Sequence, residues 1–164
     1  MTSLEPGQRR EALQQVGNPS PLALCLARNV EIVVPHLEVA ANFFTRLMGL
    51  QFRIALPCGH GLLLVPCSSI HTACMRFAID AIMLDGSGVV TRIAKDIRPW
   101  SSAIAPRGTR AVLEMTAGDT PAAVAVGEQL RLVVREQPPR HLMRRLSFLS
   151  VDHSGDRVAS KVQL

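Results

Sequence analysis

The chain has 164 residues, 48% of them hydrophobic and 19% charged, a balance typical of one folded domain with a real core. The formal net charge is +5, but residues 20–134 carry ten basic and eight acidic side chains, so no strongly basic face is expected there. No apolar run approaches the roughly 18 residues of a membrane helix. The N-terminus lacks the apolar core of a secretory signal, so a cytoplasmic protein is expected.

The composition also bears on partners and redox chemistry. One Trp and no Tyr leave few stacking platforms, so nucleic acid is not an expected partner. The four cysteines at positions 25, 58, 67 and 74 are expected as buried thiols or metal ligands rather than disulfides, because no secretory signal is recognised.

The sequence predicts a flexible arm over residues 1–20, one globular domain over 21–135 and a basic, flexible tail over 136–164. A strand is expected at 24–34, and Pro35 should end it because proline lacks a donor for the ladder. Apolar residues then recur at the spacing of one helical face across 36–50. That stretch is the one firm helix that the sequence predicts, and Gly49 is a natural C-terminal stop.

Short strands separated by turns are expected after this helix, at 61–66, 70–77, 79–84, 89–95, 109–118 and 128–134. The "DGSG" turn lies between two β-rich runs and indicates a hairpin. Between the strands, 97–108 is expected as a loop and 118–127 could hold one helical turn, while "HLMRRLSFL" could form a short helix in the tail. The sum predicts an α+β, mainly-β domain, either a compact antiparallel-rich sheet or a partly open barrel, with one packed amphipathic helix.

A cluster of thiols and imidazoles suggests metal chemistry. Cys58, His60, Cys67, His71 and Cys74 fall within 17 residues, and these are the ligand types of zinc. However, their spacing matches no standard zinc motif, and a strand over 70–77 would place His71 and Cys74 on opposite faces. No metal or other cofactor is therefore predicted, and a site made of Cys67, His71 and Cys74 stays an alternative.

Acid–base chemistry has its own candidates. Histidine is a common general base near neutral pH, so His71 is a candidate for that role. Asp80 and Glu114 are carboxylates inside otherwise apolar strands, where burial is unfavourable unless a partner is present. If these groups meet at one end of the sheet, they form a polar cleft of the kind that binds small ligands.

Arginines are the expected partners of the two carboxylates. Arg76 should pair with Asp80 across the hairpin, and Arg46 or Arg53 could reach Glu114. The alternative for both pairs is an ion-pair network that only fixes the register of the strands.

Two weaker candidates remain. Cys67 beside His71 could form an activated thiolate, although no strained elbow or ordered triad is readable. Trp100 lies in the predicted loop, where it could line a binding surface or pack over the edge of the core.

Several motifs resemble, in order, the family called domain of unknown function 192: "RLMGLQFR", "GLLLVPCSSIHTACMRFAIDAIMLDGSGVV", "RAVLEMTAG" and "VGEQL". The matching positions are Arg46, Gly49, Leu50, Arg53, His71, Met75, Arg76, Asp80, Glu114 and Gly118. The resemblance covers roughly residues 28–134 and implies a compact β-rich domain with one packed helix and no established activity. The "PC", "HT" and "MRF" form is similar to a bacterial subgroup often encoded beside pilus and secretion genes.

These observations support a main hypothesis and two alternatives. The main hypothesis is a non-enzymatic accessory domain that binds a small polar ligand or a protein partner in a polar cleft, formed by His71, Arg76, Asp80 and Glu114, with Arg46, Arg53 and Trp100 nearby. One alternative is a small hydrolase or isomerase that uses His71 as base with Asp80 or Glu114. The other is an interaction protein of a pilus or secretion apparatus that binds through its basic tail. A monomer or an edge-paired dimer is expected, because small sheets expose edges.

Overall fold

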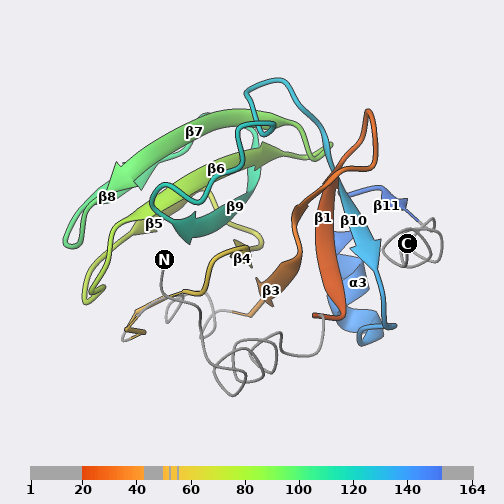
Figure 1. Cartoon of the computed structure of the whole chain (residues 1–164), viewed down its shortest axis with the longest axis horizontal. Coiled ribbons are helices and arrows are strands. Elements are labelled where there is room, and N and C mark those ends of the chain that lie inside the picture. The colour runs from red at the N-terminus through yellow and green to blue at the C-terminus, as the bar shows by residue number, and fades with distance from the viewer. Residues whose placement is uncertain (1–19, 43–49, 52, 55, 153–164) are drawn as a thin grey trace, which may run out of the picture.

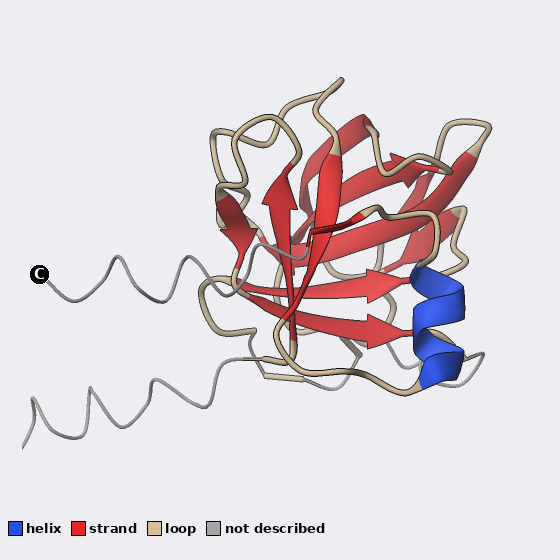
Figure 2. Cartoon of the chain, turned by 90° about the vertical axis from the view of Figure 1, so that its right-hand side faces the viewer, coloured by secondary structure: helices blue, strands red, loops and turns tan. Residues whose placement is uncertain are grey.

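The computed structural model describes residues 20–42, 50–51, 53–54 and 56–152, which form mainly β-strands (Figures 1 and 2). The elements are β1 (Leu22–Leu26), β2 (Ile32–Val34), β3 (His36–Ala40), β4 (His60–Leu64), β5 (Ser69–His71), β6 (Ile79–Asp85), β7 (Val90–Ile97), β8 (Ser102–Ile104), β9 (Thr109–Thr116), β10 (Leu130–Val134), α3 (Arg140–Leu146) and β11 (Val151–Asp152). The mainly-β class is therefore confirmed. None of the described helices is long and apolar enough to cross a membrane.

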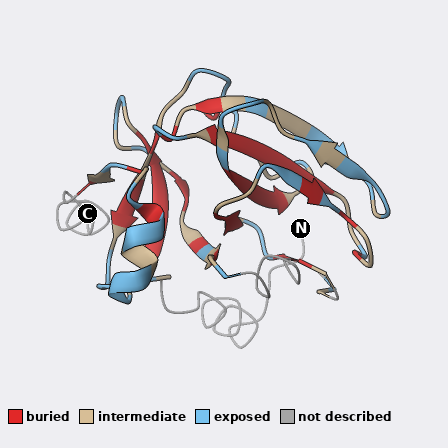
Figure 3. Ribbon diagram, turned by 180° about the vertical axis from the view of Figure 1, so that it is seen from behind, coloured by how far each residue is buried: buried red, intermediate tan, exposed pale blue. Residues whose placement is uncertain are grey.

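The described residues form three sheets, and these do not close into a barrel. Their strand orders are β11-β10-β1-β2, β3-β4-β9-β6-β7 and β5-β8. Most pairs are antiparallel, while β3–β4 and β10–β11 are parallel. Figure 3 shows that buried residues concentrate on the inner strands of the two larger sheets.

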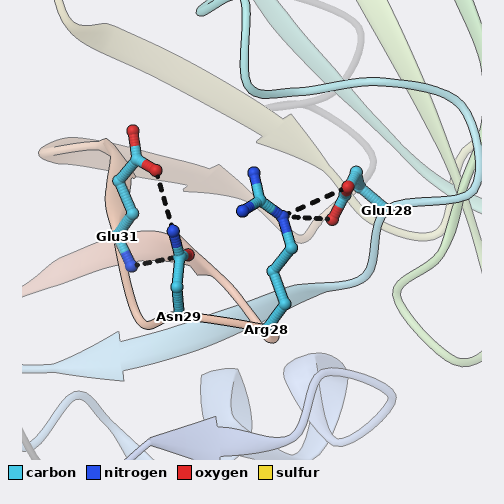
Figure 4. A network of polar contacts seen from close by, with 4 residues as sticks. All are labelled: Arg28, Asn29, Glu31 and Glu128. Atoms are coloured by element: carbon cyan, nitrogen blue, oxygen red, sulfur yellow. Dashed lines mark hydrogen bonds and ion pairs between the residues drawn. The ribbon is translucent and has the colours of Figure 1, made fainter.

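The first sheet begins with a hairpin, where the sequence predicted one strand over 24–34. β1 is buried along its whole length and pairs with both β10 and β2. In the turn, the Asn29 side chain accepts a hydrogen bond from the Glu31 backbone N–H at 3.3 Å and donates one to Glu31 Oε2 at 3.1 Å. Arg28 Nε donates to Glu128 at 3.2 Å (Figure 4). These polar contacts stabilise a reversal that apolar periodicity alone does not reveal.

The second sheet has β9 at its centre, and β9 divides two hydrophobic clusters. Leu113 and Met115 face the larger cluster, which is shared with β1, β10 and the C-terminal segment. Val112 faces a second cluster with residues of β4, β6 and β5. Because strand side chains alternate, each face of β9 contributes to a separate core.

The helix predicted over 36–50 is wrong in its first part, because residues 36–40 form strand β3. These residues pair in parallel with β4, so that Leu37 is buried on one face of the sheet and Ala40 on the other. Tertiary pairing therefore overrides the local helical spacing. The part of the predicted helix at 43–49 lies outside the described residues.

The segment after residue 135, expected as a tail, contributes helix and strand up to Asp152. α3 overlaps the short helix that the sequence suggested at 141–149 but begins one residue earlier, and β11 extends the first sheet beside β10. Leu146 at the end of α3 and Leu149 after it are each 1% exposed in the larger core, whereas most of the other α3 residues are exposed (pale blue in Figure 3).

The strand predicted over 70–77 is also wrong beyond His71. β5 ends there, and Cys74 adopts a left-handed backbone with φ 59° in the turn that follows. The reason is Thr72, which is fully buried: its Oγ1 accepts from the Ser101 N–H at 2.8 Å and lies 2.7 Å from the Arg98 carbonyl, to which it donates. These bonds draw the chain away from the ladder and toward the 98–101 loop, while residues 102–104 of the predicted loop form β8 beside β5.

The "DGSG" turn provides a matched test of how the sheets are joined. Gly88 has φ +77°, and an added Cβ would lie 2.8 Å from the Leu130 carbonyl oxygen, whereas a Cβ at Gly86 would meet nothing within 4 Å. We expect Gly88→Ala to lower the free energy of unfolding by about 2 kcal/mol or more. Gly86→Ala should change it by less than about 0.5 kcal/mol. Urea denaturation measures both, and equal effects would contradict this account.

Candidate functional site

The two carboxylates that the sequence analysis placed in one cleft lie on opposite faces of the second sheet. Asp80 on β6 is on the face of the larger cluster, with its neighbour Ile82. Glu114 on β9 is on the opposite face, with Val112 and with Ala81 across the ladder. The condition for one polar cleft was that Asp80 and Glu114 meet, but strand alternation directs their side chains to opposite faces of the sheet.

Asp80 is held by the backbone rather than by an arginine. Its carboxylate is 1% exposed and accepts hydrogen bonds from the Asp96 N–H at 3.0 Å, the Gly118 N–H at 3.1 Å and the Thr120 hydroxyl at 2.8 Å. The expected partner Arg76 is exposed instead. Asp80 thus ties the end of β7 to the turn after β9, and this satisfied carboxylate has a structural role.

Glu114 has the opposite character. It is 4% exposed, and within the described residues no hydrogen bond or ion pair engages its carboxyl group. Its cross-strand neighbours are Leu62 on β4 and Ala81 on β6, both apolar. Burial therefore raises the pKa of Glu114 from 4.5 to about 7, since desolvation disfavours the charged form.

The arginines expected near Glu114 are placed differently. Arg53 forms a two-pronged ion pair with Glu38 of β3, with nitrogen–oxygen distances of 2.7 and 3.1 Å. Because this pair lies near the surface, it contributes little to stability. It holds down the pKa of Glu38 through the hydrogen bond from Arg53. Arg46 lies outside the described residues.

The remaining candidates lie at the surface, around β5 and the loop that pairs with it. His71 is exposed, and its Nδ1 lies 3.4 Å from Gln51 Nε2. Trp100 is 74% exposed and has a left-handed backbone. Cys67 Sγ donates to the Ser69 carbonyl at 3.0 Å. Among the described residues, which include Cys67, His71 and Cys74, no group of three or more His, Cys, Asp or Glu side chains is arranged to hold a metal ion.

Sequence reasoning missed two threonines that shape this region. Thr72 anchors the turn after β5, and Thr120 donates to Asp80. The sequence pattern could have identified Thr72, because a polar residue in an apolar strand pattern needs a hydrogen-bond partner when it is buried. No such pattern could have identified Thr120, since it lies 40 residues from Asp80 and only the folded chain joins them.

Comparison with known proteins identifies a family and a shared fold. Residues 26–132 match the sequence profile of DUF192, described as "Uncharacterized ACR". A protein of unknown function from Novosphingobium aromaticivorans DSM 12444 has a TM-score of 0.58 at 20% identity, covering 68% of this chain and 83% of its own. A proposed transcription regulator from Sinorhizobium meliloti 1021 has a TM-score of 0.56 at 23% identity, and the match covers 70% of this chain and 97% of the regulator. Curated proteins yield no match.

The buried Glu114 predicts that stability falls as pH rises. Between pH 4.5 and about 7 the folded chain retains a proton that the unfolded chain has lost, so unfolding becomes easier across that window. The loss should approach about 3 kcal/mol above pH 7, at about 1.4 kcal/mol per pKa unit. Glu114→Gln should remove it, so that the variant gains stability over wild type between pH 5 and pH 8.

Urea denaturation at pH 5 and pH 8 provides the measurement. Glu128→Gln is the control, because Glu128 takes part in the surface ion pair with Arg28. A Glu114→Gln stability difference that stays constant from pH 5 to pH 8 would show that the carboxyl has an ordinary pKa.

A substitution at Asp80 should destabilise the fold. Asp80→Asn replaces one acceptor oxygen with a donor that faces the existing donors, so we expect a loss of about 2 to 4 kcal/mol in unfolding free energy. Asp119→Asn is the matched control, because the Asp119 carboxylate makes no hydrogen bond within the described part of the chain, and it should be near neutral. Chemical denaturation of both variants decides, and a loss below about 1 kcal/mol for Asp80→Asn would refute the anchoring role.

Proposed function

Because this chain belongs to the DUF192 family, whose members have no established activity, we propose that it is a non-enzymatic binding module in which Glu114 recognises a small cationic ligand. The observation that carries the proposal is the carboxyl group of Glu114, which is buried and has no partner among the described residues. This retains the ligand-binding hypothesis of the sequence but centres it on one face of the second sheet.

A carboxyl group among apolar side chains loses hydration without gaining a partner, and such groups in native proteins call for an explanation. An amine or guanidine group beside Glu114 would restore both charge balance and hydrogen bonds. The apolar neighbours Leu62 and Ala81 would suit the hydrocarbon part of the same ligand.

The catalytic alternative has less support. It requires His71 to act with Asp80 or Glu114, but within the described residues no hydrogen bond joins His71 to either, and Asp80 is committed to its three donors. Geometry of this kind is the first requirement for a general base.

The proposal places the module in the cytoplasm. All four cysteines lie in the described residues and none forms a disulfide, which suits a reducing compartment.

Calorimetry with small amines and guanidines tests the ligand class. Putrescine and agmatine are the probes, and succinate is the anionic control. Binding of a cation should ionise Glu114, so at pH 6 we expect about one proton to be released per ligand, detected as a dependence of the binding heat on the ionisation enthalpy of the buffer.

The variants show whether Glu114 is responsible. Glu114→Gln should weaken cation binding at least about 10-fold, whereas Glu128→Gln should leave it within about 2-fold. Binding that is unchanged in Glu114→Gln, or that releases no proton, would reject the proposal.

A further inference from the structure

A groove separates β3 from the residues that lead into α3. It has a volume of about 470 Å³ and is lined by residues 20–22, 37–39 and 136–139 and by Leu142. This volume is within the range of roughly 300–1,000 Å³ in which protein pockets hold ligands. The groove is bordered by β1 and β3, one strand from each of the two larger sheets, and Glu114 is not among its lining residues.

One wall of the groove is an open sheet edge. β3 is the last strand of the second sheet, and its His36 N–H donates to the Gly59 carbonyl while the Ala40 carbonyl accepts from Val65 N–H. Because backbone groups of a strand alternate between its two sides, those of Leu37 and Val39 point away from β4. The Leu37 carbonyl accepts a hydrogen bond from the Ser20 hydroxyl at 2.9 Å. The N–H and C=O of Val39 bind no other described residue.

The facing wall does not pair with this edge. Pro138 and Pro139 have no backbone N–H, so this segment cannot supply a regular ladder to β3. Among the described residues, the edge therefore remains open toward the groove, and an unpaired strand edge readily accepts an extended peptide.

The charge of the groove selects the kind of peptide. Glu38 and Glu136 are the charged residues among its described lining, and both are acidic. Glu38 is already paired with Arg53, but Glu136 is exposed and has no ion pair within the described part of the chain. The remaining side chains of the lining are mostly apolar.

We infer that this groove binds an extended peptide, with basic residues alternating with apolar ones, by strand addition to β3. Backbone hydrogen bonds at Val39 provide the pairing, Pro139 and Leu142 contact the apolar side chains, and Glu136 attracts a basic one. This surface is independent of Glu114, so either proposal can fail without the other.

An NMR titration of the ¹⁵N-labelled full chain tests the inference. The probe is the acetylated, amidated hexapeptide Val-Lys-Val-Lys-Val-Lys, compared with Val-Glu-Val-Glu-Val-Glu. We expect saturable shifts at Val39 and its β3 neighbours with the lysine peptide, and binding at least about 10-fold weaker with the glutamate peptide.

Two N-methylated forms of the lysine peptide test the strand pairing on the unmodified protein. Methylation of one alternate set of amides should weaken binding at least about 5-fold, while methylation of the other set should change it less than about 2-fold. Val39→Pro removes the backbone N–H of residue 39, and it should weaken binding of the lysine peptide as much as methylation of the first set of amides does. The melting temperature of the Val39→Pro variant shows whether it folds. If it does not fold, the methylated peptides alone show whether the peptide pairs with β3.

Charge variants complete the design. Glu136→Lys should weaken binding of the lysine peptide by about 3- to 5-fold. Glu31→Lys, in the exposed turn between β1 and β2, should leave this binding unchanged. The inference is overturned by any of three results: no saturable binding at millimolar peptide, equal effects of the two methylated sets, or a dimer of the free chain that Val39→Pro dissociates. The last result would make a second copy of this chain the occupant of the edge.

Discussion

The fold depends on β9, whose side chains alternate between two separate hydrophobic clusters. Leu113 and Met115 are fully buried on one face, and Val112 is fully buried on the other. A strand covered on both faces must be apolar nearly throughout, so a polar residue on it cannot be explained as a solvated position. Glu114 is exceptional for that reason.

Asp80 and Glu114 have similar chemistry but different surroundings. Three donors surround Asp80, so its burial connects two loops and is satisfied without any other molecule. Glu114 is on β9, whose backbone pairs with β4 on one side and β6 on the other, and its neighbours across the ladder are apolar. Similar burial therefore indicates anchoring for Asp80, whereas Glu114 has no partner in the described part of the chain.

The sequence predicted the class of the fold and most strands, because alternation and turn residues are local signals. It identified Asp80 and Glu114 as unusual, because a carboxylate in an apolar strand is visible without a structure. It could not assign their partners, since the faces of β6 and β9 and the 40-residue separation of Asp80 from Thr120 depend on tertiary pairing. It also mistook β3 for a helix, because five residues with two buried positions fit either period.

The edges of the sheets differ in how they are protected, and the difference favours β3 as the binding edge. β7, at the opposite end of the second sheet, exposes Arg92, Lys95 and Asp96 and pairs with β6 through two register shifts. Such charges and bulges are the devices that keep an edge from pairing with other chains. The edge strands of the first sheet, β2 and β11, have only three and two residues. β3 has five residues, and its one charged side chain is held by Arg53. It is the longest unprotected edge in the described part of the chain, and a groove lies beside it.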